Sequence, residues 1–70
     1  MSGDSIALTK RQLEVLRLLA EGMSTAAIAG ELGLSRTTVR NYVANVLAAL
    51  GAHSRLQAVI AARKAEILDA

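Results

Sequence analysis

The chain has 70 residues, enough for one domain, and contains no cysteine and a single histidine. A disulfide framework and a thiolate metal site are therefore excluded, and one histidine does not build a zinc site, so we expect neither a metal nor a cofactor. Alanine and leucine dominate the 53% of hydrophobic residues, and proline is absent, which predicts an all-α fold. Since neither an apolar leader nor an apolar run of the roughly 20 residues needed to span a membrane occurs, we expect a cytoplasmic protein without a membrane partner.

The formal net charge of +2 is unevenly distributed along the chain. The first 31 residues carry four acidic residues against three basic ones, whereas residues 32–70 carry five basic residues against two acidic ones. No acidic residue occurs between Leu32 and Lys64. Such a basic stretch is typical of a surface that binds a polyanion, and equally of an ordinary solvated helix face. Charge alone leaves both interpretations open.

Start and stop signals predict four helices in a domain over residues 8–70, after a disordered lead over residues 1–7. The first helix is expected to begin at Thr9, because Thr9 and Gln12 have the spacing of a capping box. Gly22 supplies its stop signal. Between these points apolar residues recur every three or four residues, as one face of an amphipathic helix requires.

The second and third helices are separated by a very short connector. The second is expected to begin at Ser24 and end at Gly33, and the third to begin at Ser35 and end at Gly51. A connector of this length suits the steep crossing of a helix-turn-helix better than an antiparallel pair. The residues expected to face inward are apolar and lie at helical spacing: Ala27, Ile28, Ala29, Leu32, Leu34, Val39, Tyr42, Val43, Val46, Leu47 and Leu50.

The fourth helix is predicted to begin at Ser54, where Ser54 and Gln57 repeat the capping-box spacing, and to run to about Leu68. It carries many apolar residues for a short helix. Val59 and Ile60 are candidates for the core, whereas apolar residues not needed there would form a face for a partner.

The outward side of the third helix carries the residue types that contact DNA. Arg36, Arg40 and Ala44 follow one another at four-residue intervals, and Thr37 and Asn41 lie beside them. Arginine pairs with guanine and asparagine with adenine, and threonine contacts bases or phosphates. Ala48 also lies beside these residues, and small residues at Ala44 and Ala48 would let the helix sit deep in a groove. The pattern favours DNA binding over a plain solvated surface.

The stretch from Leu8 to Ala62 resembles the C-terminal DNA-binding domain of the LuxR/NarL type of bacterial transcription regulators. The residues that carry the resemblance are Leu8-Thr9, Leu13-Glu14-Val15-Leu16, Leu19-Ala20-Glu21-Gly22, Ser24, Ile28-Ala29, Leu32-Gly33-Leu34-Ser35, Thr38-Val39-Arg40-Asn41, Asn45, Leu50-Gly51, Arg55 and Ala58-Val59. The resemblance implies a four-helix helix-turn-helix fold whose recognition helix, about residues 36–50, enters the major groove of double-stranded DNA. It also implies a homodimer formed through the fourth helix and, in many members, control by an upstream receiver or ligand-binding domain.

The outward residues of the third helix, together with the positions matched through the resemblance, give a predicted DNA-binding set, and the fourth helix gives a predicted dimer set. Arg40 and Asn41 match groove-facing positions, and Thr38 matches a contact to the DNA backbone. The DNA-binding set comprises Ser24, Thr25, Ser35, Arg36, Thr37, Thr38, Arg40, Asn41, Ala44 and Arg55. The dimer set comprises Leu56, Val59, Ile60 and Arg63. RNA polymerase is a further candidate partner.

The sequence departs from the family pattern where polar or charged side chains are usual. The family has a lysine or other polar residue where Ala26 stands, a glutamate at Ala27, a basic residue near Gly30 and often a lysine at Ala49. Each lost phosphate contact removes about 0.9 from the salt slope of binding. We therefore expect weaker DNA affinity than in a lysine-rich relative, or a heavier reliance on dimerisation.

Two other functions are compatible with a helix-turn-helix. The domain can serve as a protein-interaction module that docks a transcription partner through the face of Arg36 and Arg40, in which case DNA affinity would be weak and salt-sensitive. It can also be the promoter-binding region of a sigma factor, although the dimer-prone fourth helix argues against that. An enzyme is not expected, because no carboxylate pair, activated nucleophile or phosphate-binding glycine loop occurs.

Overall fold

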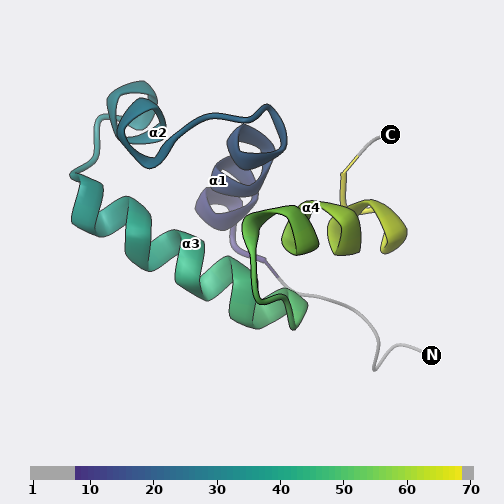
Figure 1. Cartoon of the computed structure of the whole chain (residues 1–70). Helices are drawn as coiled ribbons and strands as arrows, with labels where there is room; N and C mark the ends of the chain where they lie inside the picture. The colour runs from purple at the N-terminus through teal and green to yellow at the C-terminus, as the bar shows by residue number, and fades with distance from the viewer. Residues whose placement is uncertain (1–7, 69–70) are drawn as a thin grey trace.

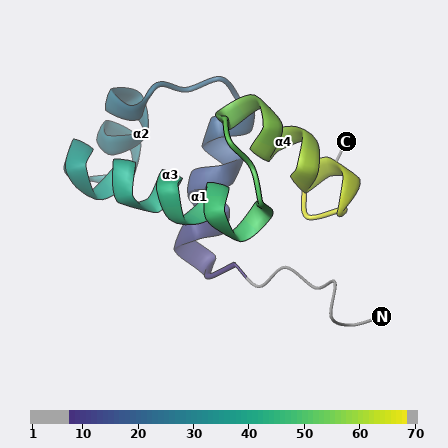
Figure 2. The same ribbon diagram turned by 60° about the horizontal axis from the view of Figure 1, so that its bottom comes forward.

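The computed structural model describes residues 8–68, so the predicted disordered lead over residues 1–7 lies outside the described residues, as do residues 69–70. The described part consists of four helices without a strand: α1 (Lys10–Ala20), α2 (Thr25–Leu32), α3 (Arg36–Leu50) and α4 (Arg55–Lys64). Helix α3 is the longest and contacts each of the other three helices, and α1 also contacts α4 (Figures 1 and 2). The prediction of an all-α helix-turn-helix domain is confirmed.

Each helix starts directly after a predicted cap residue. The side chains of Thr9, Ser24, Ser35 and Ser54 accept a hydrogen bond from the backbone amide three residues later. A cap of this kind stabilises a helix by about 1 kcal/mol. At α1 the capping box is complete, because the amide of Thr9 also donates to Gln12 Oε1 at 2.9 Å.

The capping box predicted for α4 is only half formed. Ser54 Oγ accepts from the amide of Gln57, but Gln57 Oε1 accepts from the amide of His53 at 2.8 Å and not from that of Ser54. Ser54 has a φ of −151°, whereas the cap of α1, Thr9, has a φ of −69°. The amide of Ser54 therefore does not point toward the Gln57 side chain as the amide of Thr9 points toward that of Gln12, and Gln57 accepts from the amide of His53 instead.

The connector between α2 and α3 is closed at Gly33, which has a φ of 69°. A residue with a side chain adopts this left-handed conformation at a cost, and glycine adopts it freely. The turn lets the amide of Leu34 bond the carbonyl of Ala29 at 2.9 Å, and Leu34 packs against the core. The roles predicted for Gly33 and Leu34 are confirmed.

Helix α4 ends at Lys64, earlier than the prediction of about Leu68. The chain reverses at Glu66, which has a φ of 60°, and the amide of Ile67 bonds the carbonyl of Ala62 at 2.8 Å. This reversal places Leu68 against the core with 8% of its surface exposed. The prediction was wrong because it followed the apolar spacing of Ile67 and Leu68, which pack against the core through a turn and not through further helix.

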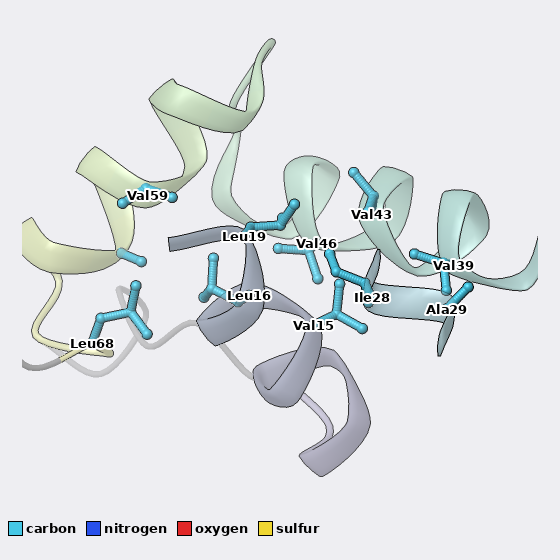
Figure 3. Packing of buried hydrophobic residues seen from close by; sticks show 11 residues of the cluster. Val15, Leu16, Leu19, Ile28, Ala29, Val39, Val43, Val46, Val59 and Leu68 are labelled. Carbon is cyan, nitrogen blue, oxygen red and sulfur yellow. The ribbon is translucent and has the colours of Figure 1, made fainter. Parts of the chain in front are cut away.

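The core lies where the four helices meet, and its side chains come from all of them (Figure 3). The largest fully buried side chains are Leu16, Ile28, Val15, Val39 and Val46. Ala29 is 7% exposed, in agreement with a small residue at a close approach of helices. Ala27, which was predicted to face inward, is exposed, because Ile28 and Ala29 together define the inner face of this short helix.

Glu66 is the one described residue other than glycine with a positive φ. A residue with a side chain pays about 1–2 kcal/mol to adopt a left-handed backbone conformation, and a glycine at the same position would not. Part of this gain would be lost, because glycine loses more conformational entropy on folding than other residues. We therefore expect Glu66→Gly to raise the free energy of unfolding by about 0.5–1 kcal/mol. Urea unfolding followed by circular dichroism measures this change in the free energy of unfolding. Ala65→Gly, at the preceding residue with a φ of −83°, is the control and should lower stability.

Within residues 8–68, no single helix is long and apolar enough to cross a membrane. Helices α3 and α4 meet that length and composition test only as a pair, which is bent by 48° at the break between them. The same residues include no group of three histidine, cysteine or acidic side chains arranged to hold a metal ion.

Candidate nucleic-acid interface

Helix α3 has a buried side and an exposed side that are opposite each other. The residues that face the core are Val39, Val43, Val46 and, partly buried, Leu50. The residue two positions before each of these is exposed: Thr37, Asn41, Ala44 and Ala48. Two residues correspond to about 200° around a helix, so these four form the centre line of the outward face. We call them the outer line of α3.

Arg36 and Arg40 flank the outer line and are exposed. No acidic residue occurs on α3, and neither arginine has an acidic partner among the described residues. The ion pair found in the described part lies on α1, between Arg11 and Glu14 at 3.2 Å. Both guanidinium groups of α3 are therefore available to an external ligand, as the sequence predicted for this face.

The first turn of α3 presents a pair of linked hydroxyls. Ser35 Oγ accepts from the amide of Thr38 at 3.1 Å and donates to Thr38 Oγ1 at 2.9 Å. Because Thr38 Oγ1 accepts that bond, its own proton remains available to an acceptor outside the protein. Thr38 is half-buried, whereas Ser35 is exposed.

The starts of α2 and α4 are brought together by a contact between two predicted site residues. Arg55 Nη2 donates a hydrogen bond to Thr25 Oγ1 across 30 residues of sequence. Ser24, beside them, caps α2 through the amide of Ala27 at 3.1 Å. The remaining amides of a first helical turn have no partner within the helix, and such a turn favours an anion. The guanidinium, the hydroxyl and the helix start thus form a cluster suited to a phosphate.

None of the described acidic residues lies on α3. They are Glu14, Glu21, Glu31 and Glu66. Three of them, all but Glu66, line a shallow groove formed by α1 and the end of α2, together with Arg17. The charged side chains of α3 and of the start of α4 are therefore all cationic, whereas the three carboxylates of the α1–α2 region are balanced by Lys10, Arg11 and Arg17. A polyanion would be attracted more strongly to the first surface than to the second.

The predicted dimer set is divided by the structure. Leu56 is 69% exposed and Ile60 45% exposed, and Arg63 is exposed as well. Val59 is 9% exposed and packs in the core with Ala62, because these residues form the inner face of α4. Val59 therefore offers almost no surface to a partner. The outer face of α4 consists of Leu56, Ile60 and Arg63.

Three exposed residues of α3 were absent from the predicted DNA-binding set, namely Asn45, Ala48 and Ala49. Ala48 continues the outer line by one turn, and Asn45 follows Asn41 at a spacing of four residues. The sequence had already placed Ala48 on the outward side of the helix, and helical spacing would have found Asn45 once the buried side of α3 was known.

A sequence model of the family described as "Bacterial regulatory proteins, luxR family" matches residues 6–62. The chain is 47% identical over 53 residues to the spore germination protein GerE of Bacillus subtilis, covering 76% of this chain and 72% of that protein. It is 44% identical over 59 residues to the response regulator RamR of Streptomyces coelicolor, covering 84% of this chain but only 29% of RamR.

Two solved structures have the same fold. The response regulator ChrA of a heme-sensing two-component system aligns with a TM-score of 0.86 and 32% identity, over 89% of this chain and 31% of ChrA. The LuxR-type receptor VqmA of Vibrio cholerae aligns with a TM-score of 0.84 and 35% identity, over 93% of this chain and 29% of VqmA. The chain thus spans most of GerE but less than a third of these longer proteins. It belongs to the LuxR family of bacterial regulatory proteins, whose helix-turn-helix domains bind double-stranded DNA to regulate transcription.

Proposed function

We propose that the chain binds double-stranded DNA sequence-specifically, with α3 in the major groove, and regulates transcription in the bacterial cytoplasm. The observation that carries this proposal is the outward side of α3, where Arg40 and Asn41 are exposed on a helix without an acidic residue. The major groove of B-form DNA is wide enough to admit an α-helix. A helix that entered it with this side forward would bring both side chains to the base edges.

Arg40 and Asn41 have complementary roles in this proposal. A guanidinium donates two hydrogen bonds to O6 and N7 of guanine, and a carboxamide pairs with N6 and N7 of adenine. Ala44, on the outer line, has no atoms beyond Cβ to hold the helix away from the base edges. Arg36 and Thr37 lie at the start of the helix and would contact a base or the adjacent backbone.

Contacts to the DNA backbone would fix the position of α3 in the groove. Thr38 offers a hydroxyl proton at the start of α3, and the cluster of Ser24, Thr25 and Arg55 offers a guanidinium at the start of α2. Phosphate contacts of this kind position a protein on DNA without discriminating between sequences. The positions that lack the usual polar or charged side chains are all exposed: Ala26, Ala27, Gly30 and Ala49. Weak affinity for DNA therefore remains our expectation.

Thr25→Val tests the phosphate cluster. The substitution removes the hydroxyl that accepts from Arg55 while it keeps the shape of the side chain. We expect affinity to fall by a similar factor for all DNA sequences and the salt slope to decrease by up to about 0.9, as for the loss of one phosphate contact. Arg55→Ala should give the same result. A changed base preference in either variant would contradict a role confined to the backbone.

Selection of bound duplexes from a random DNA pool tests the proposed function as a whole. We expect the wild-type protein to enrich a short motif in two symmetric copies. The pool should be presented at low salt, where phosphate contacts are strongest and weak binding is retained. Absence of any enriched motif under these conditions would refute sequence-specific binding and favour docking to a protein partner.

We also propose that two copies associate on DNA through the outer face of α4. Leu56 and Ile60 are one turn apart and are the large hydrophobic residues that stay exposed in the described part of the chain. Apolar surface of this kind on a small domain indicates a partner. VqmA, a LuxR-type receptor with the same fold, forms a dimer, which supports the association of two copies here. A contact with RNA polymerase stays a prediction from the family resemblance.

Leu56→Glu is expected to abolish cooperative binding to a duplex with two half-sites, because a dimer would bury one carboxylate from each copy beside the other. Binding to a single half-site should be unchanged. Titration of one-site and two-site duplexes by gel mobility shift measures both quantities. Cooperativity equal to that of the wild type would exclude this face from the dimer, and an unfolded variant would place Leu56 in the core.

A further inference from the structure

Asn45 is an exposed amide on α3 to which the proposed contacts assign no role. It makes no side-chain hydrogen bond with the described residues, and it lies one turn after Asn41. A carboxamide placed at the middle of a helix lowers its stability relative to alanine, because asparagine is the poorer helix former. The local structure of α3 therefore does not explain this residue.

The outer line of α3 separates Asn45 from Arg40. With about 100° per residue, Arg40 lies about 100° to one side of Asn41, and Asn45 lies about 40° to the other. The two side chains therefore flank the outer line on opposite sides. A helix in a groove turns one flank toward each DNA strand, so Arg40 and Asn45 would face different strands.

Asn45 is also displaced along the helix. It stands five residues after Arg40, which is about 7.5 Å along the axis. Successive base pairs are about 3.4 Å apart, so this displacement corresponds to roughly two base-pair steps. Asn45 would meet a base pair that Arg40 does not contact.

The neighbours of Asn45 allow its short side chain to reach a base. Ala44, Ala48 and Ala49 are exposed and end at Cβ. This half of α3 has no long side chain that would hold it away from the base edges. Such a surface can come closer to the floor of the groove than the arginine-bearing half.

We propose that Asn45 is a further specificity-determining residue that recognises an adenine on the strand opposite the one contacted by Arg40. Its carbonyl oxygen accepts from the adenine N6 amino group, and its amide nitrogen donates to N7. This proposal rests on the proposed function, since it requires α3 in the major groove. A purely solvated amide and a phosphate contact are the competing roles, and each gives a different experimental result.

The test is a selection from random duplexes with the wild type, Asn45→Ala and, as the matched variant, Asn41→Ala. Alanine is a better helix former than asparagine, so both variants should fold, which circular dichroism verifies. We expect Asn45→Ala to lose an adenine preference at one position and to bind the preferred duplex about 5- to 100-fold more weakly. Asn41→Ala should lose preference at a different position.

The other outcomes overturn the proposal in distinguishable ways. If the wild type enriches a motif and Asn45→Ala enriches the same one with equal affinity, Asn45 is only solvated and the proposed function stands. An equal loss of affinity on every sequence would assign Asn45 to a phosphate. If the wild type itself enriches no motif, the proposed function fails, and this inference fails with it.

Discussion

Arg40→Ala is expected to weaken binding to the preferred duplex by about 1–3 kcal/mol and to abolish base preference at one position of the half-site. Arg40 is exposed, lies beside the outer line of α3 and has no acidic partner among the described residues. Its guanidinium is therefore free to pair with guanine in the proposed complex, and alanine would leave both acceptors of that base without a protein donor. Binding titrations on the preferred duplex, and on duplexes with each other base at that position, measure the effect.

Arg17→Ala is the matched control for this experiment. Arg17 is also exposed, and the substitution removes the same side chain and the same charge, but Arg17 lies on α1 in the groove with the three carboxylates. We expect this variant to keep both affinity and base preference. If Arg40→Ala weakened binding equally on all duplexes, Arg40 would be a phosphate contact and the base-recognition role would be wrong.

Leu16→Ala is expected to lower the free energy of unfolding by about 2–5 kcal/mol. Leu16 is fully buried where α1 meets the other helices, so its truncation leaves a cavity at the centre of the core. A 70-residue domain has a small margin of stability, because it buries only about 60% of the surface its unfolded chain exposes. A substantial part of the variant should therefore be unfolded at 25 °C, which urea titration followed by circular dichroism measures.

The chain offers a control with identical chemistry for this substitution. Leu56→Ala removes the same atoms from a side chain that is 69% exposed, so its effect on stability should stay within about 0.5 kcal/mol. We expect Leu56→Ala instead to reduce cooperativity on two half-sites. Equal losses of stability in the two variants would contradict the placement of Leu16 in the core and of Leu56 on the surface.

The helix starts and the helix-turn-helix were predictable because they depend on residues close in sequence. A cap acts on an amide three residues later, and a glycine acts on its own φ, so Ser35 and Gly33 indicate a start and a turn without knowledge of the rest of the fold. The outward side of α3 follows from the same local periodicity once its apolar stripe is recognised. Arg40 and Asn41 could therefore be assigned to one exposed surface.

The features that were missed depend on contacts between distant parts of the chain. Val59 and Ile60 are both apolar neighbours on α4, and only the way α4 lies against the other helices decides that Val59 is buried and Ile60 exposed. In the same way, the sequence of α4 does not reveal that the chain reverses at Glu66. Apolar spacing predicts which residues are buried, but several backbone paths can bury them.

The sequence by itself determined the four helices, the short turn and the chemistry of α3, because each is set by spacing within a few residues. Only the tertiary structure decided that Arg55 bonds Thr25 across 30 residues and that Glu14, Glu21 and Glu31 line one groove. These relations depend on how the helices pack, since packing places side chains from separate segments on the same surface. Local spacing carries no information about that arrangement.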